Sequence, residues 1–265
     1  MASPRCGRPG TPMSADGLSL ALYSALEFGD AAAVRRALAA GADPERKISN
    51  TTWALAHYRP LQQLLSKMCN ADQYVSSGAD PIACGAALLE AGASPNIMLE
   101  AGDERAPIFT AAHIISPSAL ELLIGAGADV NVCDTYYGGY PPLYKAIYHG
   151  LRRHVALLLA AGADVNMKVD NKTPLYYAVI MGKLRRMGGM LLRAGAPLQS
   201  ILSVERFLRD DRYPYLQRMK SAGGFKQYEA RVKKSLAAML VPKFPQIPAE
   251  VIPTIVEFWA HAGDY

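Results

Sequence analysis

The sequence has few cysteines and no long apolar run. No stretch reaches the roughly 18 uninterrupted apolar residues that a membrane-spanning helix needs. The cysteines include no CxxC pair, which argues against a zinc site or a disulfide framework and favours free thiols in a reducing compartment. They are Cys6, Cys69, Cys84 and Cys133. We therefore expect a soluble intracellular protein, located in the cytoplasm or the nucleus.

The N-terminal segment also lacks the apolar core of a secretory signal. We expect residues 1–17 to form a flexible tail. Arg5 and Arg8 precede the first acidic residue, Asp16, and leave organelle targeting as the alternative interpretation.

Catalytic and metal-binding patterns are equally scarce. No histidine is paired at i, i+4 with another histidine or with a cysteine; the histidines are His57, His113, His149, His154 and His261. The GLSLA segment from Gly17 resembles a nucleophile elbow but lacks its second glycine. Gly182 and Lys183 have no phosphate loop before them. We therefore predict no catalytic residue, no metal site and no cofactor.

The sequence does contain an internal repeat. AGADVN occurs at residues 126–131 and again at 161–166, and weaker copies begin at Ala40, Ala91 and Ala194. Each copy follows an apolar run of helical character, and a glycine directly after a helix supplies the left-handed residue that ends it. We therefore expect each copy to close a helix and open a loop. Their glycines are Gly41, Gly92, Gly127, Gly162 and Gly195, which are 51, 35, 35 and 33 residues apart.

A second motif lies about 20 residues before four of these glycines. It reads ALYSALEFGD from Ala21, APIFTAAHI from Ala106, PPLYKAIYHG from Pro141 and TPLYYAVIMG from Thr173. A proline at the first helical position loses no intrahelical hydrogen bond, so the motif is typical of a helix start. It resembles the TPLHxAAxxGH segment of ankyrin repeats, and three of the four glycine spacings lie near the ankyrin period. Residues 18–200 therefore resemble about five ankyrin repeats.

This resemblance implies an all-α solenoid of antiparallel helix pairs with finger loops, in which each repeat buries its apolar face against its neighbours. Ankyrin proteins mostly bind partners through the finger tips and the concave face of the first helices. No reaction is associated with the fold. The resemblance therefore implies a non-enzymatic scaffold for protein–protein interaction, and it does not identify the partner. We expect the chain to be a monomer.

Two departures from the family pattern carry structural predictions. The motif histidine is replaced by Tyr23, Phe109, Tyr144 and Tyr176, and we expect the three tyrosine hydroxyls to take over its hydrogen bond. The second repeat is about 12 residues too long, and we place the extra residues near 69–80. Such a surface loop is either functional or tolerated variation, and the sequence favours neither.

Aromatic, imidazole and aliphatic side chains occupy variable positions where an ankyrin protein contacts its partner. Tyrosine is a favoured anchor at protein interfaces. An alternative for Phe28, Ile114 and Ile180 is packing between repeats. The candidate partner-binding residues are Phe28, His113, Ile114, Tyr148, His149 and Met181 on the helices, and Tyr136, Tyr137 and Tyr140 in the finger before Pro142.

Beyond residue 200 positive charge replaces the repeat pattern. Residues 183–243 contain 14 Lys or Arg and 4 Asp or Glu, a local net charge of +10. Such a region suggests an acidic partner, whether a protein, an anionic membrane surface or a nucleic acid. We interpret residues 201–243 as a basic helical cap over the last repeat. An amphipathic helix within it has the apolar face Phe225, Tyr228, Val232, Leu236 and Leu240.

Residues 244–265 form a short proline-rich helical tail in this reading. Its segment Ile247–Trp259 resembles the opening helix of an F-box, which would make the chain a substrate-recognition subunit of a ubiquitin ligase. The alternative is a docked tail that packs Phe258 and Trp259 on the stack. The residues that match the F-box start are Ile247, Pro248, Glu250, Val251, Ile255 and Val256.

Overall fold

The computed structural model describes most of the chain and divides it into two compact units, residues 1–142 and 143–265. Within the described residues the regular secondary structure is helical, apart from isolated bridges such as that between Val169 and Lys172. The predicted all-α class is therefore confirmed. The described residues are 14–47, 59–69, 79–96, 106–114, 116–133, 139–203, 214–243, 246–248, 250–252 and 254–256.

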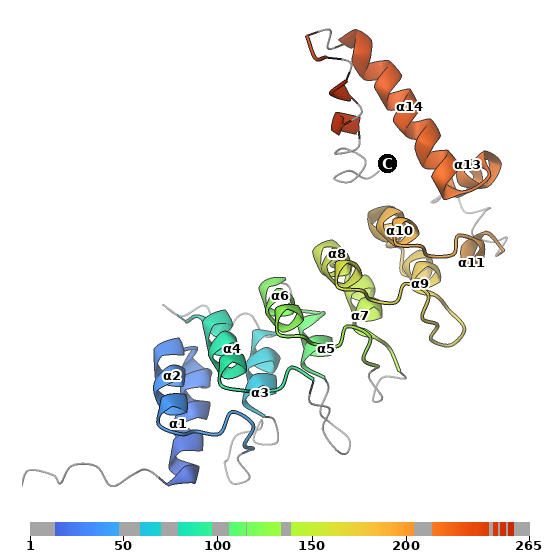
Figure 1. Ribbon diagram of the computed structural model, residues 1–265. Coiled ribbons are helices and arrows are strands. Elements are labelled where there is room, and N and C mark those ends of the chain that lie inside the picture. Colours follow the sequence, from blue (N-terminus) through green and yellow to red (C-terminus); the bar gives the residue numbers. More distant parts are fainter. Residues whose placement is uncertain are drawn as a thin grey trace, which may run out of the picture. The chain divides into compact units, whose positions relative to one another are not determined.

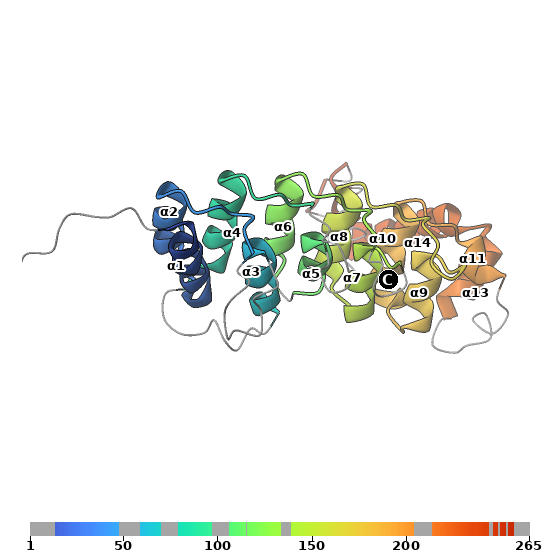
Figure 2. The same ribbon diagram turned by 90° about the horizontal axis from the view of Figure 1, so that it is seen from below.

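The first unit consists of three stacked helix pairs. The first helices, α1, α3 and α5, contact one another in order, and so do the second helices, α2, α4 and α6 (Figure 1). The two rows are separated in Figure 2. Leucines such as Leu26, Leu88 and Leu120 of these helices are fully buried. The pairs are α1 (Ala15–Phe28) with α2 (Ala31–Ala39), α3 (Pro60–Met68) with α4 (Pro81–Glu90), and α5 (Pro107–Ala111) with α6 (Ser118–Gly125).

The second unit continues the pattern and then departs from it. Helix α10 contacts both α8 and α9, and α9 contacts α11, whereas α13 and α14 form a separate pair. The side chains of Arg193 in α10 and Glu229 in α14 form an ion pair of 2.8 Å. That residues 201–243 cap the last repeat stays a prediction. The helices are α7 (Pro142–His149), α8 (Arg152–Ala160), α9 (Pro174–Ile180), α10 (Leu184–Arg193), α11 (Gln199–Leu202), α13 (Pro214–Ala222) and α14 (Phe225–Lys243).

The repeat glycines end their helices as predicted. All five have positive φ, between 83° at Gly127 and 98° at Gly195, a region that side chains with a Cβ rarely adopt. Aspartates two residues later hold the loop, because their carboxylates accept the backbone N–H two positions on. This bond is 2.8 Å long at Asp43, Asp129 and Asp164.

Tyrosine hydroxyls replace the family histidine in two of the three predicted cases. The Tyr23 hydroxyl donates to the Arg46 carbonyl at 3.1 Å, and the Tyr144 hydroxyl donates to the Met167 carbonyl at 2.8 Å. Each bond ties a first helix to the loop that follows its own repeat. For Tyr176, which is half-buried, the substitution stays a prediction.

The second helix pair contains the long interval. Twelve residues, 69–80, separate α3 from α4, whereas only Gly29 and Asp30 separate α1 from α2. Residues 70–78, where most of the predicted insertion falls, lie outside the described residues.

Polar side chains are buried along α3. Lys67 forms an ion pair with Glu27 of α1, and its side chain is 7% exposed. Burial lowers the pKa of Lys67 below its ordinary value. Glu45, in the loop after α2, binds the Arg59 guanidinium at 2.7 Å and accepts the Ser94 backbone N–H at 2.6 Å. These bonds connect the first two pairs in addition to their apolar contacts.

Candidate partner-binding surface and basic pocket

Large apolar side chains are exposed where the first helices end. Phe28, the last residue of α1, is 73% exposed, although Leu22 and Leu26 of the same helix are fully buried. Helical periodicity explains the difference, because Leu22 and Leu26 lie on one face and Phe28 points away from it. In the second unit Tyr148 of α7 is 53% exposed and Ile180 of α9 is 37% exposed. All three lie within two residues of the glycine that follows their helix.

The other candidate residues differ in their accessibility. His149 is exposed, and His113, Met181 and Tyr140 are half-buried. Ile114 is 3% exposed and therefore packs inside the first unit, which was the alternative for this residue. Tyr136 and Tyr137 lie outside the described residues.

Tyr148 and His149 form an edge-to-face ring pair, with centroids 5.1 Å apart. Desolvation, followed by the nearby Lys145 ammonium, lowers the pKa of His149 below its ordinary value. The imidazole is therefore neutral at pH 7, and together with Tyr148 it presents an uncharged aromatic surface.

His113 has a neighbour that no sequence pattern indicates. Its Nε2 lies 3.3 Å from the Cys69 thiol, and its Nδ1 lies 3.4 Å from the Phe109 carbonyl. Cys69 is 44 residues away in sequence, so no local spacing pattern contains the pair. Stacking of α3 against α5 brings the two side chains together.

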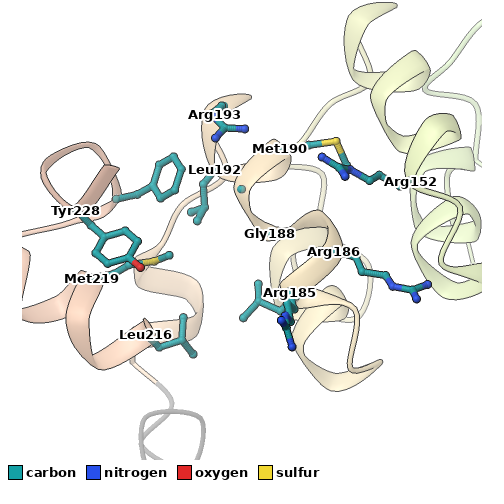
Figure 3. A pocket seen from close by; sticks show the side chains of 13 residues that line it. Arg152, Arg185, Arg186, Gly188, Met190, Leu192, Arg193, Leu216, Met219 and Tyr228 are labelled. Carbon is teal, nitrogen blue, oxygen red and sulfur yellow. The ribbon is translucent and has the colours of Figure 1, made fainter. Parts of the chain in front are cut away.

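A small pocket lies between α10 and the α13–α14 pair in the second unit. Figure 3 shows Leu192, Met219 and Tyr228 on its facing walls. The backbone of Gly188 and Gly189 contributes to the α10 side. The charged lining residues are all basic: Arg152, Arg185, Arg186 and Arg193.

In the described part of the chain, no three His, Cys, Asp or Glu side chains are grouped as a metal ion would require. Among the same residues, no helix is both long enough and apolar enough to cross a bilayer.

Stacked pairs of short helices, each closed by a left-handed glycine, define a helical-repeat protein. The family model for ankyrin repeats matches residues 108–197 in three copies. Residues 108–197 are therefore ankyrin repeats, and the predicted family is confirmed for this part of the chain. Ankyrin repeats in general mediate protein–protein interactions. No curated protein sequence matches the chain.

Proposed function

We propose that this chain is a non-enzymatic scaffold that binds a partner protein through the exposed ends of its first helices and the adjoining finger loops. The observation that carries this proposal is the exposure of Phe28. A phenylalanine that is 73% exposed contributes little to its own fold, whereas its burial by a partner would remove a large apolar area from water.

The recurrence of such residues supports the same proposal. Tyr148 and Ile180 are exposed at the ends of their own first helices, so the feature recurs in α7 and α9 and is not confined to α1. His149 and Met181 follow them directly and widen the surface. Ile114 is left out of the proposed surface because it is buried. In the finger loop, Tyr140 completes the proposed contacts together with Tyr136 and Tyr137.

Affinity purification from extracts of the source cells tests the proposal. Wild-type chain, a Phe28→Ser variant and a Tyr148→Ser variant serve as baits, with Leu20→Ser as the matched control. Leu20 is 51% exposed on α1 but lies two turns before the helix end. We expect each of the other two baits to lose partner proteins that wild type and Leu20→Ser recover. Equal recovery by all four baits would refute this surface.

The F-box interpretation of the tail is the alternative function. Ile252 and Val256 are each 3% exposed, which favours a tail that packs on its own chain over one that is free to recruit a ligase. Phe258 and Trp259 lie outside the described residues. Purification with and without residues 244–265 decides between the two, since only the ligase subunit would lose ligase components on truncation.

A further inference from the structure

Two adjacent glycines of α10 line the pocket between α10 and α14. Gly188 and Gly189 lie in the interior of α10. Glycine is unfavourable there because it loses more backbone entropy on folding than other residues and so has a low helix propensity. Packing accounts for Gly188: a Cβ there would lie 2.6 Å from Cδ1 of Leu184, which is itself buried. It does not account for Gly189, whose Cβ would meet only Nη1 of Arg193, at 3.9 Å. The missing side chain of Gly189 therefore leaves open space in the pocket.

The pocket walls combine apolar surface with positive charge. Leu192, Leu216 and Met219 are almost fully buried, while Phe225 and Tyr228 are half-buried and remain accessible. An apolar side chain that entered this space would therefore replace water beside apolar walls.

The arginines differ in how far their charge is already compensated. Arg193 is paired with Glu229 at 2.8 Å. Arg185 and Arg186 are exposed, and neither has an acidic partner in the described part of the chain. Figure 3 shows Arg186 extending away from Leu216, so of these two arginines Arg185 lies nearer that wall.

We propose that this pocket binds an acidic segment of a partner protein, with one apolar side chain beside Gly189 and a flanking carboxylate on Arg185. The proposal rests on the scaffold function and adds the chemistry of one partner. A peptide supplies an aliphatic or aromatic side chain next to carboxylates, which complements both kinds of lining. A phosphodiester backbone offers no aliphatic group for the buried leucines, and the surface of a bilayer does not enter a narrow pocket.

Selection from a displayed library of random dodecapeptides on the purified full chain tests the proposal. We expect the selected peptides to share an apolar residue flanked by Asp or Glu. A synthetic selected peptide should lose about tenfold in affinity with Arg185→Glu, because a repulsion replaces an ion pair. Gly189→Ala should weaken the peptide to a similar extent by filling the pocket, while the thermal midpoint rises because the helix gains propensity.

Arg231→Glu is the matched control. It makes the same change of charge at an exposed position of α14 outside the pocket, and should change affinity less than twofold. Selected peptides without acidic residues would overturn the proposal, and so would equal losses for Arg185→Glu and Arg231→Glu. Poly(U) RNA and phosphatidylserine vesicles are assayed in parallel, and binding of either that disappears with Gly189→Ala would assign the pocket to that ligand instead.

The two proposals fail separately. Phe28→Ser and Tyr148→Ser should retain the peptide, because neither residue lines the pocket. If Phe28→Ser or Tyr148→Ser loses the peptide while wild type and Leu20→Ser still recover their partners, the pocket proposal alone is refuted.

Discussion

The hydroxyl of Tyr144 donates a hydrogen bond to the main-chain carbonyl of Met167, 23 residues later in the chain. The same hydroxyl also contacts the Lys172 carbonyl. Because the Tyr144 side chain is 1% exposed, water does not readily replace these partners. One side chain of α7 thus holds both sides of the loop that leads to α9.

Removing this hydroxyl should destabilise the fold. We expect Tyr144→Phe to lower the free energy of unfolding by about 1–2 kcal/mol, because it leaves carbonyl groups without their donor. Urea unfolding followed by circular dichroism measures the change. Tyr148→Phe removes the same atom from an exposed ring and should change stability by less than about 0.5 kcal/mol. Equal effects of the two substitutions would show that the Tyr144 hydrogen bond contributes nothing.

The ion pair of Glu27 and Lys67 should behave as a unit. Lys67→Met leaves the Glu27 carboxylate, 26% exposed, without its counter-charge, and we expect a loss of about 2–4 kcal/mol. The double variant Glu27→Leu, Lys67→Met removes both charges and should recover most of that loss. A double-mutant cycle from urea unfolding measures the coupling. Additive effects of the two single substitutions would contradict the pairing.

The adjacent glycines of α10 should respond to alanine with opposite signs. Gly189→Ala meets no close neighbour and should raise the free energy of unfolding by about 0.5–1 kcal/mol through helix propensity. Gly188→Ala must displace the buried Leu184 side chain and should lower it by about 1–2 kcal/mol after the same propensity gain. Thermal unfolding of the two variants compares them directly. A shift of the same sign in both would contradict the packing at Gly188.

Cys84 should make stability fall at alkaline pH. Burial, followed by the carboxylates of Asp80 and Asp30, raises the pKa of its thiol to about 11, against an ordinary 9.0. Between these values the unfolded chain loses the thiol proton and the folded chain keeps it, so the free energy of unfolding decreases as pH rises. Unfolding curves of wild type and Cys84→Ala over pH 8–11 test this, because only the slope of the wild type contains the thiol. Parallel slopes would show that the thiol titrates alike in both states.

The helix pairs and their closing glycines could be predicted because their causes are local. A glycine after an apolar run ends a helix through its own backbone freedom, as Gly41 and Gly195 do. The apolar face of α14 was also visible as a periodic pattern: Phe225, Tyr228 and Leu236 are all half-buried. How deeply this face is buried could not be predicted, because burial depends on what packs opposite. None of the residues described in α14 is fully buried.

The candidate site was less predictable because accessibility depends on neighbouring helices. His113 and Ile114 occupy adjacent positions, yet one is half-buried and the other is 3% exposed. The contact of Cys69 with His113 and the pocket beside Gly189 each join elements that are distant in sequence. No spacing rule reaches across such distances, so both required the tertiary structure.

The phenol groups that stand in for histidine change how the repeats respond to acid. An imidazole gains a proton between pH 5 and 8, and a loop held by one is then coupled to the acidity of its surroundings. A tyrosine hydroxyl keeps its proton throughout that interval. The hydrogen bonds from Tyr23 and Tyr144 to the Arg46 and Met167 carbonyls therefore do not change on mild acidification. The repeats that contain them should hold their loops equally well in neutral and weakly acidic surroundings.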